Sequence, residues 1–232
     1  MLWLALSCVL GYQQEGDLTT LSIEQTKSAH YFNYDKAIQS SLRIISTDSE
    51  GNNVGHASGN YFKIGHHKFI ISAAHIIEEG YDNVVQDYYQ EVKLKLVLVD
   101  TEADIAVFIP DKKLNSIRAV DYRTNKELDL TGKMVVHAGY PADLNKAVFH
   151  GSVASCGTLS FMMQSFALPG SSGSVVFDNK GSVVGVLSAI KMGSHAHSPF
   201  PQLHPGLVYV NRLRQYDRYK LEGLILQWKG LK

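Results

Sequence analysis

Short apolar runs, separated by glycine, asparagine and aspartate, make up most of the sequence between Leu42 and Val210. Runs of this kind, bounded by turn residues, are typical of β-strands. In the first half we expect strands at 42–46, 57–64, 68–72, 92–99 and 103–109. In the second half we expect them at 133–138, 147–153, 157–163, 173–177, 183–189 and 207–210. Many short strands with few long helical patterns predict an all-β barrel or sandwich.

Two stretches show a clear periodicity. In 92–99 every second residue is apolar, which predicts a strand that buries Val92, Leu94, Leu96 and Leu98 on one face. After residue 210 the apolar residues fall near helical spacing, at Leu213, Tyr216, Leu224, Ile225, Trp228 and Leu231. We expect this tail to form a helix on the second half of the fold; a helix that binds a membrane surface or a partner is the alternative.

The changes of pattern divide the chain into six parts. Residues 1–11 form an apolar leader, and polar residues 12–41 form a lead segment in which we expect short helices. The strand-rich halves are 42–110 and 132–210, with a charged connection at 111–131 and the helical tail at 211–232. The leader is too short to span a bilayer as a helix. It resembles the core of a signal peptide without a basic start. Export to the periplasm or medium, retention in the cytoplasm and, for a viral protein, the host-cell cytoplasm therefore all stay open.

Charge and cysteine content exclude some classes of function. The 232 residues include 22 basic and 22 acidic side chains, which gives no electrostatic footprint for nucleic acid or an anionic membrane. The two cysteines are Cys8, in the leader, and Cys156, so we expect no structural disulfide. The core must therefore hold the fold together.

Three motifs carry the chemistry. The turn Pro169-Gly170-Ser171-Ser172-Gly173-Ser174 projects serine hydroxyls from small residues, and its N–H groups can bind an oxyanion. His75 ends an apolar run in Ser72-Ala73-Ala74-His75, and Asp104 opens another in Asp104-Ile105-Ala106-Val107. A nucleophilic serine needs a base that is itself held by a third group, and the order His, Asp, Ser is one that occurs in such triads. Taken singly, each residue could instead be an ordinary turn or strand-end residue.

In these motifs the chain resembles the chymotrypsin-fold (trypsin-like) serine proteases, and within them the HtrA-like branch, without the PDZ domain that many of those proteins have. Two further stretches fit the branch, 135–141 and 181–186, and the likeness covers roughly residues 42–210 in the expected order. The resemblance implies two six-stranded antiparallel β-barrels with the site between them. It also implies Ser172 as nucleophile, His75 as base, Asp104 as its partner, and the N–H groups of Gly170 and Ser172 as the oxyanion hole.

The same resemblance places a substrate pocket and shows departures from the family. The pocket would be lined by Phe166, Ala167, Leu187, Ser188, Ala189 and Ile190. Phe166 stands six residues before Ser172, where proteases specific for Lys or Arg have an aspartate. We therefore expect a small or medium apolar residue before the scissile bond, because a buried cation needs a paired acid. Ser174 replaces the usual glycine, and the Ile-Val-Gly-Gly segment of trypsin-type zymogens is missing.

Other functional classes are less well supported. His195, His197 and His204 lie in one loop, but no nearby cysteine or carboxylate completes a metal site, so we expect no metal and no cofactor. The expected partner is a protein or peptide substrate; the oligomeric state stays open. A catalytically silent protease fold used as a binding module is the main alternative to an active endopeptidase. An α/β-hydrolase esterase would need the order Ser, Asp, His, which the chain does not have.

Overall fold

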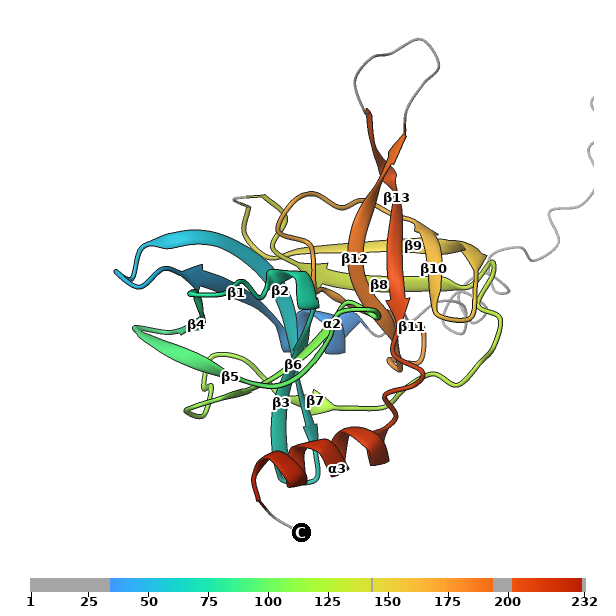
Figure 1. Cartoon of the computed structure of the whole chain (residues 1–232). Coiled ribbons are helices and arrows are strands. Elements are labelled where there is room, and N and C mark those ends of the chain that lie inside the picture. The colour runs from blue at the N-terminus through green and yellow to red at the C-terminus, as the bar shows by residue number, and fades with distance from the viewer. Residues whose placement is uncertain (1–33, 143, 194–201, 231–232) are drawn as a thin grey trace, which may run out of the picture. The chain divides into compact units, whose positions relative to one another are not determined.

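The structure is a computed structural model that describes residues 34–142, 144–193 and 202–230. The leader, residues 12–33 of the lead segment, and His195 and His197 lie outside these residues. Within them the chain folds into two barrels that lie side by side, with one α-helix before them and one after them (Figure 1).

The first barrel has six strands, and each pairs antiparallel with its neighbours. They are β1 (Ser41–Thr47), β2 (Asn53–Ile64), β3 (His67–Ser72), β4 (Asp82–Asp87), β5 (Gln90–Asp100) and β6 (Ile105–Pro110). Their order is β1-β4-β5-β6-β3-β2, and the pairing of β1 with β2 closes the barrel. A short strand β7 (Val120–Asp121) in the inter-barrel connection pairs parallel with β2.

Two details of the first barrel differ from the sequence-based expectation. Strand β4 was not predicted, because only Val84 and Val85 are apolar in a run that begins and ends with aspartate. In β5 the pairing with β6 shifts between Leu96 and Leu98. Such a bulge inserts one extra residue and disrupts the regular alternation of buried and exposed side chains. Around it, Leu96 is 38% exposed rather than buried, and Val97 and Leu98 are both half-buried.

The second barrel is also closed and antiparallel. Its strands are β8 (Met134–Gly139), β9 (Ala147–Cys156), β10 (Ser160–Gln164), β11 (Val175–Asp178), β12 (Val183–Gly193) and β13 (Gln202–Arg212). They follow one another around the barrel in the order β10-β13-β12-β11-β8-β9. The predicted pair of six-stranded antiparallel barrels is thus confirmed.

Apolar side chains fill each barrel and the seam between them. The inter-barrel cluster joins residues of both barrels, among them Phe62, Phe69 and Ile71 from the first and Val136, Ala138 and Phe177 from the second. All six are at most 1% exposed. Because burial of large apolar side chains stabilises a fold by about 1.5–3 kcal/mol each, this cluster fixes the two barrels against one another. Residues that meet at the seam are therefore held by a rigid frame.

Two helices flank the barrels. Helix α2 (Tyr34–Ser40) buries Ala37 and Ser40 ahead of β1. Helix α3 (Arg218–Trp228) confirms the predicted C-terminal helix and begins at Asp217, whose side chain accepts a hydrogen bond from the N–H of Lys220. Within the described part of the chain, no helix is long and apolar enough to cross a membrane.

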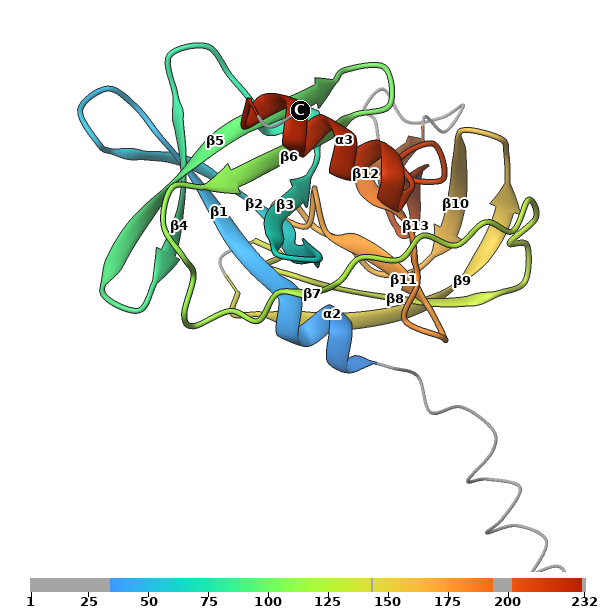
Figure 2. The ribbon, with the colours of Figure 1, turned by 90° about the horizontal axis from the view of Figure 1, so that it is seen from below.

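The place of α3 differs from the expectation. It buries Leu221 and Ile225 in the inter-barrel cluster, to which both barrels contribute, and it lies against β5 of the first barrel rather than on the second barrel alone (Figure 2). A hydrogen bond just before the helix explains this placement. The hydroxyl of Tyr216 donates to the carboxylate of Asp100, at the end of β5.

Candidate active site

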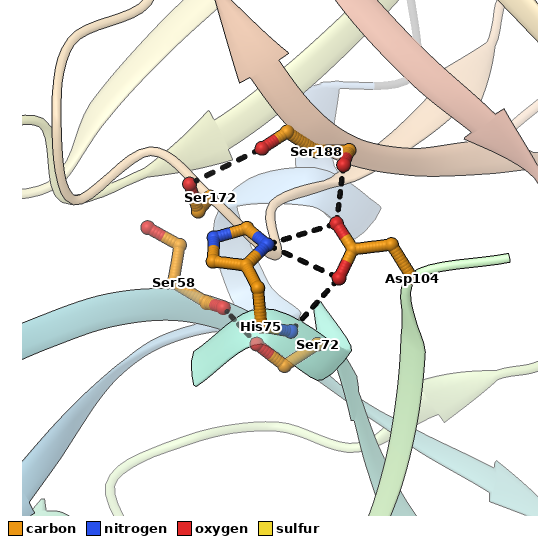
Figure 3. Close-up of polar contacts among 6 residues, drawn as sticks. All are labelled: Ser58, Ser72, His75, Asp104, Ser172 and Ser188. Carbon is orange, nitrogen blue, oxygen red and sulfur yellow. Dashed lines mark hydrogen bonds and ion pairs between the residues drawn. The ribbon is translucent and has the colours of Figure 1, made fainter. Parts of the chain in front are cut away.

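The imidazole of His75 and the carboxylate of Asp104 are hydrogen-bonded to each other. His75 lies in a short 3-10 turn, Ala74–Ile76, that follows β3. Its Nδ1 is 2.8 Å from Oδ2 and 3.1 Å from Oδ1 of Asp104, and its backbone N–H donates to Oδ1 at 2.8 Å. A carboxylate only accepts hydrogen bonds, so Nδ1 carries the proton. The other ring nitrogen is left on the side of Ser172 (Figure 3).

Asp104 is held as an anion by the groups around it. Burial by itself raises its pKa, but hydrogen bonds from His75 and from the hydroxyl of Ser188 outweigh burial, and the pKa is lowered. The side chain of Asp104 is 15% exposed, against 47% for His75. Its backbone has a φ of +50°. Residues other than glycine rarely adopt this left-handed conformation, and those that do are frequent at functional sites.

Ser172 comes from the second barrel, in the turn before β11. Its hydroxyl donates a long hydrogen bond, 3.5 Å, to the carbonyl oxygen of Ser188 in β12. No hydrogen bond joins its Oγ to His75 among the described residues. The side chain is half-buried and lies beside the imidazole (Figure 3). The structure thus brings the three residues to one place at the seam, with two of them bonded.

The backbone of this turn leaves two N–H groups free. The N–H groups of Ser171, Gly173 and Ser174 donate to Leu168, Leu187 and Ser171, at 2.9, 2.8 and 3.1 Å. Those of Gly170 and Ser172 donate to no other described residue. They are the two N–H groups that the sequence analysis expects in an oxyanion hole. A pair of unpaired backbone donors beside a serine hydroxyl is the arrangement that such a hole requires.

A cavity of about 340 Å³ opens in front of Ser172, between the barrels. Its lining comes from both of them and includes Gly55, His56, His75, Glu78, Gly170 and Ser172. A larger cavity, of about 720 Å³, lies along the inter-barrel connection and the start of α3, and none of the three candidate catalytic residues lines it. Of the two, the smaller cavity is the one that Ser172 and His75 line.

Comparison with known families identifies the family of this chain. The family model described as "Trypsin-like peptidase domain" matches residues 57–186, more than half of the chain, and the match includes His75, Asp104 and Ser172. This chain belongs to the trypsin-like peptidase family. No curated protein matches it significantly.

Among solved structures, this trypsin-like peptidase is similar to the serine endoprotease from Yersinia pestis, with a TM-score of 0.62 and 16% sequence identity. The match covers 83% of this chain but 65% of the other, so the chain spans less than two thirds of that protein's length. At this identity the likeness shows the chymotrypsin-type fold, which the two barrels display, and not a shared substrate.

The residues expected to form the substrate pocket do not line the described cavity. Phe166 is 43% exposed and packs on Phe149, with ring centroids 5.4 Å apart. Ala167 and Leu187 are fully buried in the core of the second barrel. Ser188 is half-buried, and the structure does not describe the side chains of Ala189 and Ile190. The specificity pocket of this trypsin-like peptidase therefore stays a prediction.

Sequence reasoning missed two contacts at the site. Ser188 was expected only as a pocket residue, whereas its hydroxyl also bonds Oδ2 of Asp104 (Figure 3). His56 was not expected at all; its Nε2 donates to the carbonyl oxygen of Tyr140 at 3.1 Å, and it lines the cavity beside Gly170. No local pattern marks either residue, since each partner is more than 80 positions away.

No metal site accompanies these residues in the part of the chain that the structure describes, where no group of three histidine, cysteine, aspartate or glutamate side chains could hold an ion. His195 and His197 lie outside that part, and the side chain of His204 is not described.

Proposed function

We propose that this trypsin-like peptidase is a serine endopeptidase that acts through a triad of Ser172, His75 and Asp104. The observation that carries the proposal is the His75–Asp104 pair, bonded through Nδ1 and placed beside Ser172 at the seam. In this tautomer Nε2 is the nitrogen that can take a proton, and it lies on the side of the serine. The free N–H groups of Gly170 and Ser172 support the same proposal.

The chemistry follows from these positions. Ser172 Oγ attacks the carbonyl carbon of the scissile peptide bond while its proton passes to His75 Nε2. Asp104 stabilises the imidazolium, and the N–H groups of Gly170 and Ser172 bind the oxyanion; losing one such donor typically costs about 10²–10³ in rate. The imidazolium then protonates the leaving amine, and an acyl-enzyme remains. Water, deprotonated by His75, hydrolyses this ester and restores the serine hydroxyl.

For specificity we propose a small or medium apolar residue before the scissile bond. Phe166 occupies the position at which proteases specific for Lys or Arg have an aspartate in the substrate pocket. Ala167 and Leu187 are apolar as well. The HtrA-like character is likewise a proposal; it rests on the ordered motifs between residues 72 and 186. Cleavage of a peptide library only after Arg, Lys or Glu would contradict the proposed specificity.

The second candidate function is a catalytically silent protease fold that binds peptides. One observation favours it: the hydroxyl of Ser172 donates to the carbonyl oxygen of Ser188, and not to His75. A serine whose proton is bound elsewhere is not activated until it turns. At 3.5 Å, however, this contact is longer than the usual range for a hydrogen bond between a hydroxyl and an oxygen, so little energy opposes that rotation.

A fluorophosphonate probe distinguishes the two candidates, because it reacts with an activated serine hydroxyl and not with ordinary ones. The wild type should be labelled on Ser172, and Ser172→Ala and His75→Ala should not. If folded wild type is not labelled at concentrations that label a reference protease, the silent binding module is the better description.

A further inference from the structure

Ser58, in strand β2, bonds the proposed catalytic turn with its side chain as well as its backbone. It is fully buried at the seam between the barrels. Its hydroxyl donates to the carbonyl oxygen of Gly170 at 2.7 Å and accepts from the N–H of Tyr140 at 2.8 Å. Its backbone N–H donates to the carbonyl oxygen of Ser172 at 2.8 Å. One residue of the first barrel thus joins two loops of the second.

The two turn residues that Ser58 holds are those whose N–H groups are free. Ser58 binds the carbonyl groups of Gly170 and Ser172, and so fixes the Gly170–Ser171 and Ser172–Gly173 peptide planes. These two planes lie on either side of the plane that carries the N–H of Ser172. A hydrogen bond on a carbonyl limits rotation of the backbone that carries it. The positions of the free N–H groups of Gly170 and Ser172 therefore depend on the position of Ser58.

Ser58 is itself held firmly. Its carbonyl oxygen accepts a hydrogen bond from the hydroxyl of Ser72 at 2.7 Å (Figure 3). Two glycines pack against it without room for a side chain: a Cβ on Gly139 would lie 2.7 Å from its Oγ, and one on Gly173 would lie 2.2 Å from its carbonyl oxygen. Ser58 therefore transmits the rigid geometry of the first barrel to the turn.

We propose that Ser58 is a positioning residue whose hydroxyl sets the conformation of the Gly170–Ser172 turn, and with it the oxyanion hole. This inference rests on the proposed endopeptidase function and extends it. The backbone bond to Ser172 can be made by any residue at position 58 except proline. The link between Gly170 and Tyr140 is different, because it needs a group that donates and accepts at once, and a hydroxyl does both.

The test compares Ser58→Ala with a matched control, Ser41→Ala. Ser41 is equally buried, in β1, and its hydroxyl also crosses the seam, where it donates to the carbonyl oxygen of Ala138 at 3.0 Å. It does not contact the turn. Both variants lose a buried interbarrel hydroxyl, but only Ser58→Ala loses one that holds the turn. Ser58→Thr keeps the hydroxyl and serves as the rescue.

Two measurements are made on each protein. Hydrogen exchange of residues 168–174 reports the turn whether or not the protein is an enzyme, because four of its N–H groups are bonded within the protein. We expect exchange about tenfold faster in Ser58→Ala than in Ser41→Ala. With a peptide that the wild type cleaves, we expect kcat to fall about 10- to 100-fold in Ser58→Ala with KM within about twofold, since the loss falls on the transition state. Ser58→Thr should restore most of both.

Each outcome decides a different claim. Unchanged exchange in Ser58→Ala overturns the inference, whatever the activity. Faster exchange with unchanged kcat shows that the hydroxyl holds the turn but does not position the oxyanion hole, which also overturns it. Faster exchange in a protein whose wild type neither cleaves peptides nor takes the fluorophosphonate probe supports the structural part and refutes the proposed function.

Discussion

His137 makes the stability of this protein depend on pH. It lies in β8, is 1% exposed, and packs on the ring of Phe149 with centroids 5.4 Å apart. Its Nδ1 has no hydrogen-bond partner among the described residues, and its Nε2 is 3.4 Å from the hydroxyl of Ser165. Burial disfavours the charged imidazolium and lowers the pKa of His137 to about 4, although the backbone of Phe166 acts in the opposite direction.

This pKa determines the direction and the size of the change in the free energy of unfolding with pH. An unfolded histidine titrates near pH 6.5, so between that pH and pH 4 the unfolded chain binds a proton that the folded one does not. The full stability is present above pH 6.5 and is lost as the pH falls toward 4. Each unit of pKa difference corresponds to about 1.4 kcal/mol, so the total loss is about 3 kcal/mol. Between pH 7 and pH 5 it is about 2 kcal/mol.

Urea unfolding at pH 7 and pH 5 measures this loss, with His137→Gln as the comparison and both proteins carrying Ser172→Ala to prevent self-cleavage. Any change in stability that the glutamine itself causes cancels, because each protein is compared with itself at two pH values. Carboxylates such as Asp104 titrate alike in both proteins. We expect the wild-type free energy of unfolding to fall by about 2 kcal/mol more than that of the variant. Equal pH dependence within about 0.5 kcal/mol would refute the argument from burial.

Three further predictions concern single positions. Gly173→Ala should destabilise the fold by several kcal/mol in thermal unfolding, about 3 or more, because φ is +86° and the new Cβ would lie 2.1 Å from Ser72 Oγ and 2.2 Å from Ser58 O. Asp104→Asn should lower kcat about 10⁴-fold with little change in the melting temperature, because an amide does not hold the histidine in the required tautomer; a loss under about tenfold would remove Asp104 from the triad. Gly223→Ala, in α3 with open space around it, should raise the free energy of unfolding by about 0.5–1 kcal/mol, and a decrease would show that the glycine has a role in packing.

Local patterns in the sequence predicted the barrels well. The strands of the second barrel are bounded by glycine and polar turns, and each contains several apolar residues in a short run, so their existence could be read directly. Strand β4 was missed because only two of its residues are apolar. Its place in the barrel comes from its pairing with β1 and β5. The bulge in β5 was missed for a similar reason: it is a property of the pairing with β6, and no residue in β5 marks it.

For the candidate site, the sequence predicted the three residues of the proposed triad but not the contacts that hold them in place. His75, Asp104 and Ser172 stand out because each lies in a motif beside an apolar run, and the structure brings them together at the seam. Ser58 is one of several polar residues in β2, so nothing in the sequence distinguishes it, and its partner Gly170 is 112 positions away. Such contacts depend on how two barrels meet, which is decided by the packing of the inter-barrel cluster and not by any local pattern.

The packing at the seam between the barrels explains why the turn consists of small residues. In sequence, glycine at position 173 is only a common turn residue. In the structure, a side chain there would collide with Ser58 and Ser72 and come within 3.0 Å of the backbone nitrogen of Ala73, two residues before His75. A larger residue would push the turn, and Ser172 with it, away from the imidazole. A shift of about 1 Å can cost a hundredfold in rate. The glycine after the serine therefore sets the distance between two barrels, and through it the distance between the proposed nucleophile and its base.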